Sequence, residues 1–130
     1  MSNNIITNVQ FKSSEWKVQL ADAENLCQLA ATFVWKVASK FDKAFEVTIV
    51  LADDGLVQTL NHKYRNQNKP TNVLSFPSGM EETGFHEDLP TLGDVIVAFE
   101  TVKAEAGSRL SEHLSHLVVH GCLHLLGYDH

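Results

Sequence analysis

Apolar residues recur along this chain in two periods, one of which predicts strands and the other helices. Short runs rich in β-branched and aromatic residues, bounded by turn-forming residues, predict four strands. The predicted strands are residues 4–11, 45–51, 73–76 and 92–99. Pro77 ends the third of them. Apolar positions three or four residues apart predict a helix over 21–40. We expect its apolar face to pack in the core through Leu26, Leu29, Ala30, Phe33, Val34 and Val37.

Capping residues and apolar spacing predict the other helices. Asp53 or Asp54 caps a helix that ends near Asn66, a residue that tolerates left-handed backbone angles. Gly107 ends a short helix that begins at residue 100. Ser108 caps a long helix that runs to about residue 126.

The order of these elements, with no internal repeat and no linker, predicts one α+β domain over residues 1–130. We expect a mixed four-stranded sheet packed with helices. Residues 78–90 contain glycines and several acidic side chains but no periodicity, so we expect an exposed, mobile loop there. At 130 residues, the chain is long enough to bury a core of its own.

Histidines gather at the end of the long helix and just after it, at His120, His124 and His130. Two imidazoles four residues apart project from one helical face, so both can bind one ion. Gly127 can adopt the left-handed conformation that ends a helix, which gives His130 a route to the same ion. Three neutral nitrogen ligands leave one position of a tetrahedral zinc open for water, as in catalytic sites. The pattern predicts one Zn²⁺ per chain, although nickel, copper and iron also accept three imidazoles.

The spacing of these histidines resembles the zinc motif of the metzincin proteases, His-Glu-x-x-His-x-x-Gly-x-x-His. In those enzymes the glutamate is the general base that activates the zinc-bound water, and here that position is Gly121. Glycine has no side chain that could accept a proton. The motif therefore keeps the metal ligands without the peptidase base, which favours a metal hydrolase that acts on a different bond.

Four segments, in order along the chain, resemble the YbeY family of bacterial endoribonucleases, which act in ribosomal RNA maturation. The resemblance covers the chain from about Val47 to His130. Its segments are Leu60-Asn61 with Tyr64-Arg65, the run PTNVLSFP at 70–77, the run LGDVIV at 92–97, and the histidine segment at 120–130.

The resemblance implies the same α+β architecture, with a metal site at the C-terminal helix. It implies a single-strand-specific, metal-dependent endoribonuclease that matures the 3′ end of 16S rRNA and acts in ribosome quality control. Its partners would be single-stranded RNA, ribosomal RNA and the small ribosomal subunit, with no membrane and no DNA. His120, His124 and His130 would hold the metal, and His120, His124 and Arg65 would be the catalytic residues.

The resemblance also places Arg65 beside the metal, where its fork of donors suits bidentate contact with a phosphate. By that interpretation the metal lies in a cleft between the last helix and the loops around Arg65 and Asp94. An acid such as Asp94 within an apolar run needs a partner. We expect it to anchor a loop by hydrogen bonding; the alternative is that it orients a ligand histidine.

The net charge of −6 at pH 7 is unusual for a nuclease, because nucleic-acid-binding proteins commonly carry a basic face. Lys63, Arg65 and Lys69 supply a local basic cluster, and a divalent metal would add positive charge. The sequence has neither an apolar run that spans a membrane nor a signal segment, so we expect a cytoplasmic protein. Cys27 and Cys122 should stay reduced there, with Cys122 as a buried apolar filler.

Four histidines form one stripe on the long helix, because His113, His116, His120 and His124 fall within about 80° of one another at helical spacing. We expect His113 to be a hydrogen-bonded surface histidine. For His116 the same role and a functional one, contact with RNA or protonation of a leaving group, stay open.

Two other functions remain open at this point. The first is a metallohydrolase on another substrate, including a peptidase whose base comes from elsewhere. The second is a non-catalytic ribosome-assembly factor, in which the ion fixes the C-terminal helix. For a nuclease, the nucleophile is also open: it is a metal-bound hydroxide or the 2′-hydroxyl of the RNA.

Overall fold

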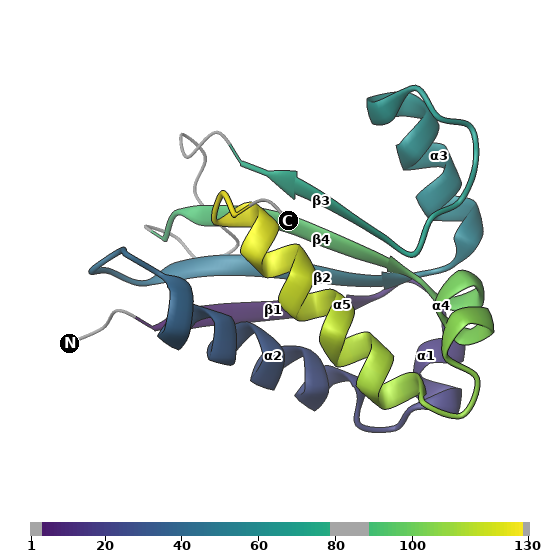
Figure 1. Cartoon of the computed structure of the whole chain (residues 1–130), viewed down its shortest axis with the longest axis horizontal. Helices are drawn as coiled ribbons and strands as arrows, with labels where there is room; N and C mark the ends of the chain where they lie inside the picture. Colours follow the sequence, from purple (N-terminus) through teal and green to yellow (C-terminus); the bar gives the residue numbers. More distant parts are fainter. Residues whose placement is uncertain (1–3, 79–88, 129–130) are drawn as a thin grey trace.

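The computed structural model describes residues 4–78 and 89–128. In these residues one four-stranded sheet is packed with helices (Figure 1). The strands are β1 (Ile5–Phe11), β2 (Phe45–Ala52), β3 (Val73–Pro77) and β4 (Thr91–Ala98). The helices are α1 (Glu15–Gln19), α2 (Ala23–Ala38), α3 (Asp54–Arg65), α4 (Phe99–Ala106) and α5 (Leu110–Leu125). The predicted α+β class is confirmed.

The strand order is β1-β2-β4-β3. β1 and β4 both run parallel to β2, and β3 pairs antiparallel with β4 at the sheet edge. The sheet is therefore mixed, as the sequence predicts. In the described part of the chain, no helix is long and apolar enough to cross a membrane.

The main core lies between one face of the sheet and the helices α2 and α5, which run across that face (Figure 1). Alternate strand residues point into it, because side chains along a strand alternate between faces. Val47, Ile49 and Leu51 of β2 are completely buried there, as are Val95 and Val97 of β4. The sheet is thus held on one side by two long helices, and one of these carries the histidine stripe.

A smaller core lies under α3, on the opposite face of the sheet. Val57 of α3 packs there with Leu74 of β3 and Ile96 of β4. Asp53 caps α3 by accepting a hydrogen bond from the Leu56 N–H at 2.9 Å, as predicted. Asn66 ends the helix at φ 58°, which confirms the left-handed cap. α3 covers only one end of this face, so the rest of the face stays open.

The predicted apolar face of α2 is only partly in the core. Ala30 and Val34 are buried, but Leu29, Phe33 and Val37 are 59%, 58% and 70% exposed. The helix meets the core through small residues such as Ala30 and through Trp35, which is 6% exposed, whereas the three exposed side chains lie beside this contact. Apolar spacing predicts a helical stripe correctly, but it does not predict how wide the contact beneath the stripe is.

The other differences from the prediction concern one short helix and the start of α5. α1 was not predicted, although its Trp16 is completely buried and donates its indole N–H to the Ala52 carbonyl at 2.9 Å. α5 begins at Leu110, and its cap position is Arg109 without a side-chain capping bond, so the expected Ser108 cap is wrong. Most of the loop predicted at 78–90 lies outside the described residues.

Candidate active site

His120 and His124 lie one turn apart in the last two turns of α5, and both are half-buried. Gly127 follows the helix with φ 95°, the left-handed conformation that the sequence predicts. His130 lies outside the described residues. Within residues 4–78 and 89–128, no three His, Cys, Asp or Glu side chains gather closely enough to hold a metal ion. The three-histidine ligand set, which includes His130, therefore stays a prediction.

Gly121, between the two histidines, lies at a close approach between α5 and the sheet. A Cβ atom placed on Gly121 would lie 2.7 Å from Cγ1 of Val95 and 3.2 Å from Oγ of Ser75. Val95 is completely buried, so it has little room to move aside. The glycine is thus required by packing, a reason that its sequence position did not reveal. The same packing leaves no space for the glutamate that serves as base in the metzincin motif.

Arg65 is the last residue of α3 and reaches back to the edge strand. Its Nη2 donates a hydrogen bond to the Ser75 carbonyl at 2.7 Å, and its guanidinium lies 4.9 Å from the ring centre of Phe76. The hydroxyl of Ser75 donates to the Gly121 carbonyl at 3.4 Å. Arg65 is therefore linked through a single residue to the helical turn that carries His120 and His124.

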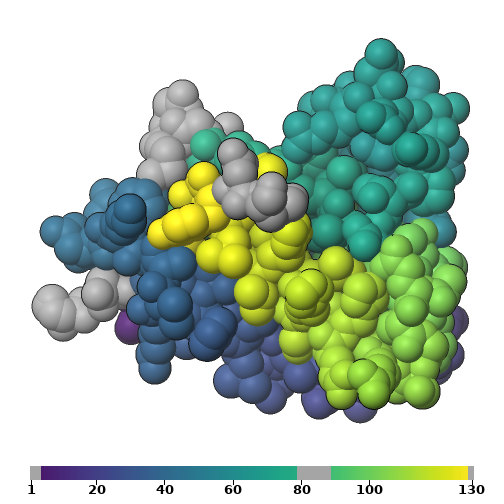
Figure 2. Space-filling model, viewed as in Figure 1, coloured from purple at the N-terminus to yellow at the C-terminus, as the bar shows by residue number. Residues whose placement is uncertain are grey.

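The surface of α5 borders the segment formed by α3 and β3 (Figure 2). Contacts within the turn after α3 hold that segment in place. The buried side chain of Asn61 donates from Nδ2 to the Lys69 carbonyl at 2.9 Å, and the Gln67 N–H donates to the Asn61 carbonyl at 3.2 Å. Sequence reasoning assigned no role to Asn61 or to Ser75. The signal available in the sequence was a polar amide at a helical position four residues after the apolar Val57, where a buried side chain needs a hydrogen-bond partner.

The basic cluster expected around Arg65 surrounds the end of α3. Lys63, Arg65 and Lys69 are all exposed. The ammonium of Lys63 lies 5.1 Å from the ring centre of Tyr64. These cations give a protein of net charge −6 a local positive surface at the end of α3, and Arg65 links that surface to the histidine turn.

The first part of the histidine stripe belongs to a hydrogen-bonded network. Nε2 of His113 lies 2.8 Å from a carboxylate oxygen of Glu105, which also accepts a bond from Nδ2 of Asn72 at 3.1 Å. The bond from His113 lowers the pKa of Glu105 below its usual value. His116 stacks parallel to His113, with 6.5 Å between the ring centres. The expectation of a hydrogen-bonded surface role for His113 is confirmed.

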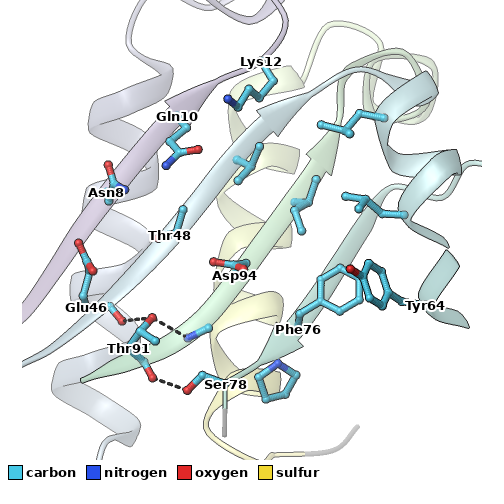
Figure 3. A pocket seen from close by; sticks show the side chains of 16 residues that line it. Asn8, Gln10, Lys12, Glu46, Thr48, Tyr64, Phe76, Ser78, Thr91 and Asp94 are labelled. Carbon is cyan, nitrogen blue, oxygen red and sulfur yellow. Dashed lines mark hydrogen bonds between the residues drawn. The ribbon is translucent and has the colours of Figure 1, made fainter. Parts of the chain in front are cut away.

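Asp94 departs from its expected place. It is exposed on the sheet face opposite α5, where it lines an open groove of about 860 Å³ (Figure 3). Its neighbours in β4, Val95 and Val97, point toward the helices instead. Asp94 therefore does not share a cleft with the histidines, and that part of the prediction is wrong. The apolar run around Asp94 suggested a strand buried on both faces, but one face of β4 is open at Asp94.

Cys27 and Cys122 are both buried between the helices and the sheet. Burial raises the pKa of each thiol to about 12. At neutral pH both stay protonated, and only the thiolate is a good nucleophile or metal ligand. Their role as apolar filler is therefore confirmed for the predicted Cys122 and extends to Cys27.

Comparisons with known proteins show which family this chain is similar to. A profile of the family described as Endoribonuclease YbeY matches residues 8–130. A relative named Endoribonuclease YbeY from Paramagnetospirillum magneticum is 45% identical over 140 aligned residues, covering 100% of this chain and 82% of the relative. Another of the same name, from Parvibaculum lavamentivorans, is 43% identical over 128 residues, covering 92% of this chain and 67% of the relative.

A solved structure shares the architecture as well. The solution structure of TM1509 from Thermotoga maritima superposes with a TM-score of 0.54 and covers 96% of this chain and 75% of that one. The two sequences are 24% identical, so this likeness concerns the fold alone.

Proposed function

Because this chain belongs to the YbeY family of endoribonucleases, we propose that it is a zinc-dependent endoribonuclease that cuts single-stranded RNA. Its proposed substrate is ribosomal RNA, with the 3′ end of 16S rRNA as the maturation site and the small ribosomal subunit as partner. Ribosome quality control and a cytoplasmic location belong to the same proposal. The observation that carries the catalytic part is the contact path from Arg65 through Ser75 to the turn between His120 and His124.

The donor set at this turn fits a divalent metal. His120 and His124 supply two imidazoles from one helical face, and close packing at Gly121 keeps the turn against the sheet. His130 would complete the set. When bound, zinc would supply a Lewis acid and would lower the pKa of a bound water molecule.

Arg65 would hold the scissile phosphate. Its guanidinium has five N–H donors, and the bond from Nη2 to Ser75 fixes its direction. The remaining donors can bind a phosphate in bidentate fashion while that anchor stays in place. Negative charge that builds on the phosphate oxygens in the transition state would then meet a preorganised cation.

The open alternative, a peptidase whose base comes from elsewhere, would indeed need a base at a position other than 121. A glutamate at position 121 would have to displace Val95 and Ser75, which lie 2.7 and 3.2 Å from the first side-chain atom. RNA also suits the local positive surface formed by Lys63, Arg65 and Lys69 better than an ordinary peptide does.

Replacing Arg65 tests the proposal. Arg65→Ala should lower the rate of RNA cleavage by about 10²- to 10³-fold, as losses of a charge-stabilising donor do, and should leave the zinc content unchanged. Arg109→Ala is the matched control, because Arg109 is an exposed arginine at the far end of α5. Loss of zinc from Arg65→Ala, or equal cleavage by Arg65→Ala and Arg109→Ala, would contradict the assigned role.

A further inference from the structure

Two aromatic rings form a platform at one end of the open sheet groove. The rings of Tyr64, from α3, and Phe76, from β3, meet edge to face, with 5.4 Å between centres and 65° between planes. Both line the groove, and Figure 3 shows them side by side at its α3 end. Tyr64 is 56% exposed, which is unusual for a large aromatic side chain that packs on another ring.

Positive charge flanks this platform. The Arg65 guanidinium lies 4.9 Å from the centre of the Phe76 ring, and the Lys63 ammonium lies 5.1 Å from the centre of the Tyr64 ring. Arg65 therefore borders two surfaces at once: the platform through Phe76, and the histidine turn through Ser75 and Gly121. A pair of rings with a cation beside each matches the way proteins hold unpaired nucleotides, with the base on a ring and the phosphates on the cations.

We propose that Tyr64 and Phe76 form a stacking subsite for an unpaired RNA base, next to the phosphate that Arg65 holds. This inference rests on the proposed function, since it assumes that RNA is the substrate. The RNA chain would cross the edge of the sheet at β3. One nucleotide would lie on the groove side of the sheet, and the scissile phosphate would lie on the side of α5. Since a base within a duplex is not free to stack on protein, the subsite accounts for a preference for single strands.

The groove floor suits bases rather than phosphates. Asn8, Gln10 and Thr48 present amide and hydroxyl groups, which can bond to the edges of bases. The charged residues that line the groove are Glu46, Asp94 and Lys12, so two carboxylates outnumber one ammonium and disfavour a phosphate backbone along the groove. The RNA backbone would then lie near Lys63 and Arg65, which contact the two rings of the platform, with the bases directed into the groove.

The test is RNA binding by the full chain in the presence of a chelator, so that affinity is measured without cleavage. The probe is a fluorescently labelled single-stranded oligoribonucleotide, followed by anisotropy. Tyr64→Ala should weaken binding about tenfold, because stacking on an aromatic ring contributes roughly that much per base. Tyr64→Phe keeps the ring and should restore affinity to within about twofold of the unaltered chain. Phe33→Ala, which removes an equally exposed ring from α2, should change nothing.

Salt dependence separates stacking from charge. Tyr64→Ala should weaken binding by the same factor at every salt concentration, whereas Arg65→Ala should reduce the salt slope by about one phosphate contact. Circular dichroism verifies the fold of each variant. Equal affinity of Tyr64→Ala and the unaltered chain would overturn the subsite and would favour a protein partner for the groove. Failure of the proposed function is distinguishable, because the zinc-loaded unaltered chain would then leave RNA uncut, whatever the affinity of Tyr64→Ala.

Discussion

Gly121→Ala is the substitution whose effect the structure determines most sharply. In a helix interior, alanine is more favourable than glycine by about 1 kcal/mol. At Gly121 the added methyl group would lie 2.7 and 3.1 Å from the two methyl groups of Val95, inside normal contact distance. Overpacking of this kind costs about 1–3 kcal/mol. The expected net effect is a loss of about 1 kcal/mol, which at this chain length lowers Tm by about 3–5 °C.

Urea unfolding at neutral pH measures this difference, and Gly55→Ala provides the control. Gly55 is also helical, but a Cβ there would meet its nearest atom, Oδ1 of Asp53, at an ordinary 3.6 Å. Gly55→Ala should therefore stabilise the protein, by up to about 1 kcal/mol. Adding Val95→Ala to Gly121→Ala should recover about 1 kcal/mol relative to the sum of the single effects. If Gly121→Ala stabilises the chain as much as Gly55→Ala does, α5 and β4 do not pack as closely at Gly121 as described.

The remaining predictions concern a strained glycine, an acid-sensitive contact and two thiols. Gly93→Ala should destabilise the chain by about 2–4 kcal/mol in the same urea assay, because Gly93 has φ 135° and an added Cβ would contact the backbone of β3; a loss below about 1 kcal/mol would argue against that conformation. The pKa of Glu105 is lowered in the folded state by the bond from His113, so its contribution to stability is present above the pKa of the unfolded carboxyl and is lost as pH falls through the folded value. Glu105→Gln should thus cost no more than about 1 kcal/mol at pH 7, since the contact is exposed, and in urea titrations its difference from the unaltered chain should shrink as the pH falls through the lowered pKa of Glu105. With pKa values of about 12, Cys27 and Cys122 should resist iodoacetamide at about pH 8 until the chain is unfolded, and labelling of the native protein as fast as a free thiol would contradict their burial.

The four strands and the helices α2 to α5 were predictable because their signals are local, whereas the five-residue helix α1 is too short to show a periodic pattern. Asp53 and Asn66 are short polar residues at the two ends of α3, and both cap it as expected. The width of a contact is not local information, which is why Leu29, Phe33 and Val37 were expected in the core and are exposed.

The position of His120 and His124 on one helix was predictable, but the contacts that hold this helix against the sheet were not. The spacing of His120 and His124 is a property of one helix, and the structure places both on α5 as expected. The contacts of Gly121 with Val95 and of Arg65 with Ser75 join distant segments, so no local pattern contains them. The position of Asp94 was not predictable either, because an apolar run does not show whether both faces of its strand are covered.

The central claim is that the histidine turn of α5 carries metal-dependent cleavage of RNA. Its most direct test compares zinc-loaded protein with His124→Ala, prepared identically, on a labelled single-stranded RNA. The account predicts site-specific cleavage by the unaltered chain, its loss on chelation, and its absence in His124→Ala even when zinc is supplied. Equal cleavage by both proteins would contradict the site, and no cleavage by the zinc-loaded unaltered chain would contradict the nuclease and favour a metal-stabilised assembly factor.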